Sequence, residues 1–254
     1  MKWIDTHCHL YSEEFNGDID ELIERANAAG VEKFFLPAID SSTHEAMLKL
    51  EQKSTACIAM IGLHPCYVNA GYEKELMVVK EWLEKRRFAA IGEIGLDYYW
   101  STEFAAQQAI AFDRQMQWAL DYNLPIVIHT RNAMQPTIDA VKPFAVKSLR
   151  GIFHCFSGNA NEAEQIVNMG FYLGIGGILT YKKSSLPEAI KNIPLDKIVL
   201  ETDAPYLPPV PYRGKRNESS YIPIIAQKLA EVKNVSLEEV AAVTTLNAEK
   251  IFGS

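Results

Sequence analysis

The sequence is poor in cysteine, has no long apolar run and has no excess of basic residues. Its four cysteines (Cys8, Cys57, Cys66 and Cys155) form no CxxC pair, so we expect reduced thiols rather than disulfides or a zinc knot. No apolar stretch approaches the roughly 20 residues of a membrane helix, so no membrane association is expected. Charged residues interrupt the N-terminal stretch where a signal peptide would need an apolar core. The expected localisation is therefore cytoplasmic.

The charge balance excludes one class of nucleic-acid binder. A formal net charge of -7 argues against a broad basic surface that holds nucleic acid by its backbone. If the protein binds a phosphate group, a small local set of cationic side chains and hydrogen-bond donors must then bind it. With 48% apolar residues over 254 positions, the chain can bury a sizeable core, and we expect residues 1–254 to form a single domain.

Short apolar runs alternate with longer segments of helical period. In one such segment, Ile19, Leu22, Ile23 and Ala26 share a helix face. Eight alternations in a chain of this length favour an α/β fold of the closed (β/α)8 TIM type over an open doubly wound sheet. The apolar runs, each expected to contain a strand, are KWIDTHCHL, VEKFFLPAI, ACIAMIGLHP, FAAIGEIGLDYY, LPIVIHTR, RGIFHCFSG, GFYLGIGGIL and KIVLETDAPYL.

Side chains that can bind metals or transfer protons recur where these strands would end. In a TIM-type barrel the carboxyl ends of the strands meet at one mouth, so residues placed there converge. The opening DTHCH motif, for example, puts two histidines on one face of a strand. The residues expected at the mouth are His7, His9, His64, Glu93, Asp97, His129, Arg131, His154, Glu201 and Asp203.

Imidazole and carboxylate ligands without thiolates suit Zn, Mn, Fe or Mg at a catalytic centre rather than a structural zinc site. Burying such groups without an ion would cost several kcal/mol each. The ligand set is too large for one tetrahedral ion, whereas two ions about 3.5 to 4 Å apart, bridged by a carboxylate, would use it fully. We interpret His64 as a hydrogen-bonding neighbour rather than a ligand. The predicted metal ligands are His7, His9, Glu93, His129, His154 and Asp203.

Cations and aromatic residues lie near the same predicted mouth. Arg131 follows His129 by two residues, and the run YRGKR over residues 212–216 lies in the last long loop. These cations have two interpretations, a local site for a phosphate diester or ordinary solvated loops. The aromatic residues have two as well, since they either stack on bases or pack locally. They are Tyr98, Tyr99, Trp100, Tyr206 and Tyr212.

Seven motifs occur in a fixed order along the chain: DTHCHL, GLHP, GEIGLDYY, LPIVIHTR, HCFSG, ETDAPYL and RGKRNE. With these motifs the chain resembles the TatD family of metal-dependent deoxyribonucleases, within the amidohydrolase superfamily. The motifs run from residue 5 to 218, and with the closing helices the resemblance covers essentially the whole chain. It implies a TIM-type barrel that uses two divalent ions (Mg, Mn or Zn) to activate water for hydrolysis of phosphodiester bonds in DNA.

Matching the motifs assigns a role to each residue. The resemblance implies that His7 and His9 hold one ion, completed by Asp203, which is also the expected base for the attacking water. His129 and His154 would hold the other ion, and Glu93 would bridge the two. We expect the phosphate to be positioned by His64, Arg131, Lys215 and Arg216.

The implied substrate is DNA, as single strands or ends, and the implied activity is a deoxyribonuclease, expected to act as an exonuclease. No obligate protein partner is inferred. Three residues depart from the family pattern and bear on substrate preference: Tyr11, Cys66 and Ser219. Two alternatives stay open. The same metal centre also serves hydrolases of small amides, esters or lactones, and the barrel also serves as a scaffold for non-catalytic binding.

Overall fold

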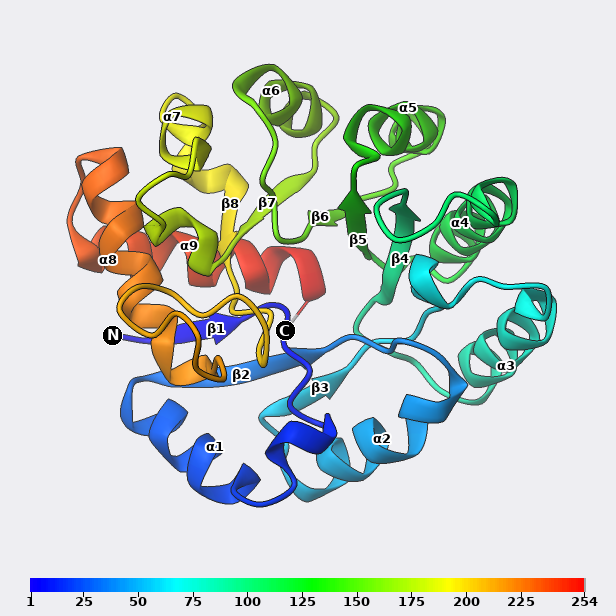
Figure 1. The fold of residues 1–254 in the computed structure, drawn as a ribbon, viewed down its shortest axis with the longest axis horizontal. Coiled ribbons are helices and arrows are strands. Elements are labelled where there is room, and N and C mark those ends of the chain that lie inside the picture. Colours follow the sequence, from blue (N-terminus) through cyan, green and yellow to red (C-terminus); the bar gives the residue numbers. More distant parts are fainter. Residues whose placement is uncertain (254) are drawn as a thin grey trace.

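A computed structural model of the protein describes residues 1–253. Eight parallel strands alternate along the chain with helices, and the helices surround the strands (Figure 1). The strands are β1 (Trp3–Asp5), β2 (Val31–Leu36), β3 (Cys57–Ala59), β4 (Ile91–Asp97), β5 (Ile126–Arg131), β6 (Gly151–Phe153), β7 (Tyr172–Ile175) and β8 (Ile198–Leu200). The helices are α1 (Ile19–Ala28), α2 (His44–Lys53), α3 (Tyr72–Lys85), α4 (Ala105–Asp121), α5 (Met134–Ala145), α6 (Ala160–Asn168), α7 (Leu186–Ile190), α8 (Ile222–Lys233) and α9 (Leu237–Phe252).

Backbone links at two seams close the strands into a barrel. Hydrogen bonding orders β1–β2–β3 and β4 to β8 as two groups. A bridge between Ile61 and Ile91 joins the first group to β4. At the other seam, the Thr6 N–H donates to the Leu200 carbonyl at 3.1 Å, which joins β1 to β8. The predicted (β/α)8 fold is therefore confirmed.

A buried carboxylate reinforces the seam between β1 and β8. Asp5 accepts hydrogen bonds from the Thr202 N–H at 3.0 Å and from the Ser219 hydroxyl at 2.7 Å. Ser219 begins the short 3-10 helix η6 (Ser219–Tyr221), so this contact anchors the chain that leads into α8. Asp5 thus has a structural role, two residues before His7.

The amino-terminal end of the barrel is plugged by α9. Phe35 of β2 points into the barrel and its ring stacks on Phe252 of α9, with centroids 3.8 Å apart. Asn247 of α9 donates to the carbonyl of Ile198 at 2.8 Å, at the start of β8. The open end is therefore the carboxyl end of the strands. The inward-facing cluster beneath it contains Ile4, Phe35, Met60, Ala90, Val127, Ile152 and Val199.

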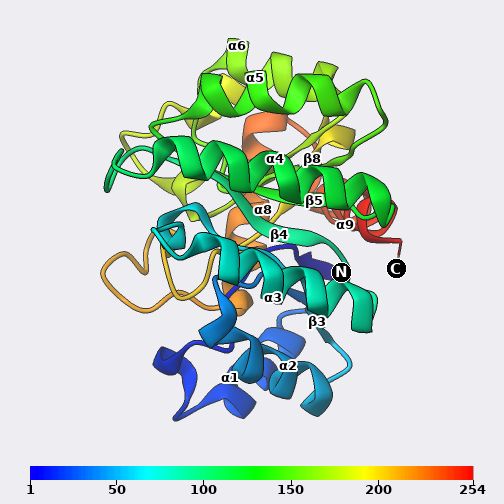
Figure 2. The same cartoon turned by 90° about the vertical axis from the view of Figure 1, so that its right-hand side faces the viewer.

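The outer layer of helices follows the chain order around the barrel. Figure 2 shows α3, α4 and α5 packed next to one another on this layer. Apolar residues of these helices share a buried cluster with outward residues of the neighbouring strands, such as Ile128 of β5. Within residues 1–253, no helix combines the length and the hydropathy that a membrane crossing requires.

Candidate metal centre

The structure brings the six predicted metal ligands together at the open end of the barrel. Glu93 and His129 lie in β4 and β5, while the other four come directly after β1, β6 and β8. Their side-chain atoms form two neighbouring groups, each compact enough to surround an ion. The groups are His7, His9 and Asp203, and Glu93, His129 and His154.

Glu93 lies between the two groups, and each of its oxygens faces a different one. Oε2 lies 3.1 Å from His7 Nε2 and 3.7 Å from His9 Nε2. Oε1 lies 2.8 Å from both His129 Nδ1 and His154 Nε2. A carboxylate placed in this way has the geometry of a bridge between two cations.

Asp203 completes the group around His7 and His9. Its Oδ1 lies 3.6 Å from the Nε2 atom of each of these histidines. The Asp203 backbone has φ of 57°, a left-handed conformation that non-glycine residues seldom adopt. The Asp203 N–H donates to the His7 carbonyl at 2.9 Å, which ties this unusual backbone to the neighbouring ligand.

The charges in the site favour bound cations. Burial disfavours ionisation of Glu93, but the imidazoles of His154, His64 and His7 outweigh it and hold the pKa of Glu93 well below its usual range. Burial lowers the pKa of His7, so its ring is neutral near pH 7 and keeps a lone pair for an ion. Both ring nitrogens of His7 are buried without a hydrogen-bond partner among residues 1–253. Divalent ions at this site would satisfy such a nitrogen, so the residues fit a two-metal centre.

Tyr11 orients His9. The Tyr11 hydroxyl donates to the carbonyl of Pro37 and lies 3.0 Å from His9 Nδ1. Because the single hydroxyl proton is used on Pro37, the Tyr11 oxygen accepts from His9 Nδ1–H. This leaves the His9 Nε2 lone pair directed toward Glu93 and Asp203, as a metal ligand requires. The sequence marked Tyr11 only as a departure from the family pattern, so this role was missed.

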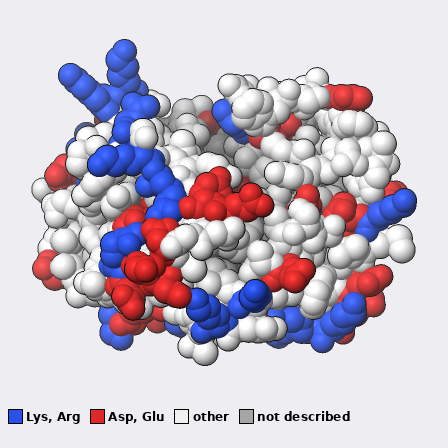
Figure 3. All heavy atoms as spheres, turned by 60° about the horizontal axis from the view of Figure 1, so that its bottom comes forward, with Lys and Arg blue, Asp and Glu red and all other residues white. Residues whose placement is uncertain are grey.

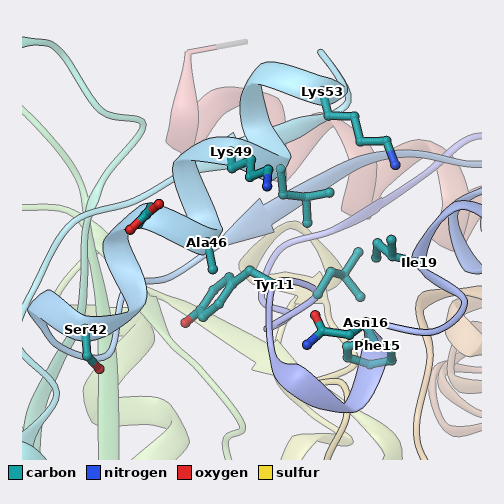
Figure 4. A pocket seen from close by; sticks show the side chains of 11 residues that line it. Tyr11, Phe15, Asn16, Ile19, Ser42, Ala46, Lys49 and Lys53 are labelled. Carbon is teal, nitrogen blue, oxygen red and sulfur yellow. The ribbon is translucent and has the colours of Figure 1, made fainter.

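The opposite side of Tyr11 faces a separate cavity. This cavity, of about 460 Å³, lies between the β1–α1 loop and α2, and Tyr11, Phe15, Ile19 and Ala46 line it (Figure 4). None of the six predicted ligands lines it. Tyr11 therefore both lines the cavity and contacts His9 of the metal centre.

Asp97 orients His129 in the same manner. Its Oδ2 lies 2.8 Å from His129 Nε2, while His129 Nδ1 faces Glu93. A proton on Nε2 leaves Nδ1 free for an ion. Burial opposes the charged form of His129, but the hydrogen bonds to Asp97 and Glu93 outweigh it and raise the pKa of this histidine. The sequence placed Asp97 at the mouth without a role, although it follows Glu93 by four residues on the same strand.

His64 presents an N–H group to the centre. The backbone N–H of Cys66 donates to His64 Nδ1 at 3.0 Å, so in the neutral ring the proton is on Nε2. Nε2 lies 3.3 Å from Glu93 Oε1. His64 therefore lies beside the ligands as a donor, in line with its interpretation as a hydrogen-bonding neighbour.

The predicted phosphate-binding cations do not gather at one point. Arg131 is exposed at the mouth, with its guanidinium carbon 3.6 Å from the ring centroid of Tyr99. Lys215 lies over the ring of Tyr212, at 5.9 Å from the centroid. Figure 3 shows a band of Lys and Arg side chains on the left of a face whose middle carries Asp and Glu, with further Lys and Arg side chains along its lower and right edges. This distribution agrees with local rather than broad positive charge.

Arg216 differs from the expectation. It donates to both carboxylate oxygens of Asp18, at 2.8 and 2.6 Å, and to the carbonyl of Glu14 at 2.6 Å. Its guanidinium also lies over the ring of Phe15. These contacts make Arg216 a link between the last long loop and the β1–α1 loop, and they do not bring it to the metal ligands. The charge run alone did not reveal this partner.

A closed (β/α)8 barrel with a carboxylate between two histidine groups at the open end is typical of metal-dependent hydrolases. The chain belongs to the TatD related DNase family, whose model matches residues 4–253.

Relatives span the full length of the chain. It is 39% identical over 249 residues to the uncharacterized metal-dependent hydrolase YabD of Bacillus subtilis, covering 98% of each chain. It is 32% identical over 255 residues to the 3'-5' ssDNA/RNA exonuclease TatD of Erwinia tasmaniensis, again covering 98% of each. The crystal structure of the TatD homologue YjjV from Escherichia coli superposes with a TM-score of 0.94 at 30% identity, covering 99% of this chain and 98% of that one.

Proposed function

We propose that this protein hydrolyses phosphodiester bonds of DNA, at single strands or ends, with two divalent ions held by His7, His9, Asp203, His129, His154 and the bridging Glu93. The observation that carries the proposal is that the two oxygens of Glu93 face separate histidine groups. The similarity to an exonuclease acting on single-stranded DNA and RNA supports the choice of substrate.

The ions, when bound, lower the pKa of a water molecule and stabilise negative charge on the phosphate. Asp203 is the proposed base. Burial disfavours its ionised form, but the neighbouring imidazoles of His9, His154 and His7 outweigh it and lower the pKa of Asp203, so the carboxylate is ionised at neutral pH and ready to accept a proton.

Other residues position the substrate. His64 directs its Nε2–H toward Glu93 Oε1, where a phosphate oxygen that approaches the centre would accept it. Arg131 supplies positive charge at the rim, within reach of a neighbouring phosphate. Glu201 Oε1 accepts a hydrogen bond from the backbone N–H of Cys155 and lies 3.6 Å from His154 Nδ1. Glu201 is therefore placed to orient the proposed ligand His154.

The test is cleavage of an end-labelled single-stranded oligonucleotide by chelator-treated protein, with and without Mg, Mn or Zn. We expect added metal to restore cleavage, and we expect Asp203→Asn to abolish it. Asp196→Asn is the matched control, because Asp196 is exposed near the amino-terminal end of β8. No cleavage with any metal, together with turnover of small amides, esters or lactones, would overturn the proposal in favour of a small-molecule hydrolase.

A further inference from the structure

Within the described part of the chain, the exposed aromatic side chains all follow strands at the mouth of the barrel. Within residues 1–253, the large aromatic side chains that are exposed are Tyr67, Tyr99, Trp100 and Tyr206. Each lies in a loop that follows a strand at the mouth, after β3, β4 or β8. Trp100 has 71% of its surface in water and Tyr99 has 50%. Flat apolar rings left exposed beside a proposed active site indicate a ligand with flat faces of its own.

Two of these rings form a unit with Arg131. The rings of Tyr99 and Trp100 meet edge to face, with centroids 4.9 Å apart. The guanidinium carbon of Arg131 lies 3.6 Å from the Tyr99 centroid and 5.2 Å from that of Trp100. Arg131 forms no ion pair in the described part of the chain, so its charge is available to an anion. A nucleotide offers both a flat base and a phosphate anion to such a unit.

The carboxylate of Asp97 connects this unit to the proposed metal centre. Asp97 Oδ1 accepts from the backbone N–H of Tyr99 at 2.9 Å and of Trp100 at 3.4 Å. Its Oδ2 lies 2.8 Å from His129 Nε2. The side chain of Gln108 in α4 in turn donates to and accepts from the Asp97 backbone, at 3.1 and 2.9 Å. The buried Asp97 carboxylate therefore holds both the loop that carries Tyr99 and Trp100 and the proposed ligand His129. This shared contact fixes the distance between the loop and the proposed metal centre.

We propose, on the basis of the function proposed above, that Tyr99, Trp100 and Arg131 form a stacking site for one unpaired nucleobase next to the scissile phosphate. A base within a duplex has both faces covered by its neighbours, so only a single strand or a frayed end can use the site. Stacking reads the flat face that all bases share, so the site tolerates any base sequence.

The test separates stacking from catalysis. The substrates are single-stranded oligonucleotides in which an abasic sugar analogue replaces one base. The position of this analogue is moved stepwise away from the end, and KM and kcat are measured for the wild type and for Trp100→Ala. Stacking of one base on an aromatic ring corresponds to roughly 5- to 150-fold in affinity. We expect Trp100→Ala to raise KM for the intact strand within this range, with kcat unchanged. At one abasic position the two proteins should have the same KM.

Two further variants sharpen the result. Trp100→Phe, which keeps a ring, should restore most of the affinity, and Ile110→Ala is the control because Ile110 is exposed on α4. Binding of a fluorescently labelled strand to chelator-treated protein gives a readout independent of cleavage. Cleavage with the same KM in Trp100→Ala would overturn the stacking site and leave the proposed function intact. Absence of both binding and cleavage in the wild type would overturn the function itself.

Discussion

The imidazole rings of His7 and His154 stack with centroids 3.7 Å apart and planes 7° from parallel. The two histidines follow different strands, β1 and β6, and their Nε2 atoms face different oxygens of Glu93. Each ring thus faces its own oxygen of Glu93, an arrangement that would suit two adjacent ions, one on each side of the carboxylate.

Glu93→Gln should remove the bridge between the proposed ions. The amide retains the shape of the side chain but lacks the negative charge that two cations share. We expect the variant to retain fewer than two ions per chain, measured by elemental analysis, and to lose cleavage together with the metal. Glu32→Gln is the control, because Glu32 is exposed and pairs with Lys2. Two bound ions with normal turnover in Glu93→Gln would contradict the bridging role.

Tyr11→Phe should weaken metal binding without altering the fold. The variant removes the acceptor that holds the proton of His9 on Nδ1. Loss of such a supporting hydrogen bond typically reduces metal affinity by about 10- to 100-fold. Competition with a chelating dye would measure this change, and Tyr72→Phe is a suitable control since the Tyr72 hydroxyl donates to Glu73 at the surface, away from the predicted ligands. Equal affinity in Tyr11→Phe and the wild type would show that Tyr11 merely packs against His9.

Much of this architecture could be predicted from the sequence. The alternation of apolar runs with helical segments specifies a barrel, because parallel strands need a crossover between them and eight such units close a ring. Closure of the strands into a barrel in turn predicts which residues at the strand ends lie close together. His7 and His154 are far apart in sequence, yet both follow a strand, and the carboxyl ends of all strands share one mouth.

Other features depend on side-chain directions that no spacing encodes. Asp97 and Glu93 lie on one strand, yet they contact opposite nitrogens of His129, Nε2 and Nδ1 respectively. The orientation of this one imidazole ring decides which carboxylate supports it and which faces the proposed metal centre. Tyr11 reaches His9 only because its hydroxyl finds the carbonyl of Pro37, which belongs to another strand's loop. Such contacts are set by packing between loops, so the sequence predicted which candidate ligands converge but not the contacts of the residues that orient them.

The partner of Arg216 is a further contact that the sequence did not predict, and its role can be tested by substitution. It pairs with Asp18, 198 residues away, with roughly a third of each side chain exposed. We expect Arg216→Ala to lower the free energy of unfolding by up to about 1 kcal/mol. Asp18→Ala should have a similar effect and the double variant little more, as measured by urea denaturation. If Arg216→Ala instead raises KM for an oligonucleotide while Asp18→Ala does not, Arg216 meets the substrate as the sequence predicted.

Glu218, at the end of the last long loop, should contribute to the stability of the protein in a pH-dependent way. Its carboxylate is largely buried and accepts two hydrogen bonds from Arg25 of α1, at 3.1 and 2.8 Å. Burial opposes ionisation, but the bonds from Arg25 and Ser220 outweigh it and lower the pKa of Glu218 below its ordinary value of 4.5. A carboxylate with a lowered pKa in the folded state stabilises the protein above the unfolded pKa, and this contribution is lost as the pH falls.

We therefore expect Glu218→Gln to be less stable than the wild type by about 1 kcal/mol at pH 7, since the charge-assisted hydrogen bonds from the solvent-exposed Arg25 are weakened. The difference between the two proteins should stay constant down to about pH 4.5 and shrink at lower pH. Urea denaturation of chelator-treated protein across this range would measure it, with Glu231→Gln as the control because Glu231 pairs with Lys228 at the surface. A difference that does not change with pH would mean that Glu218 stabilises the loop through packing rather than through its charge.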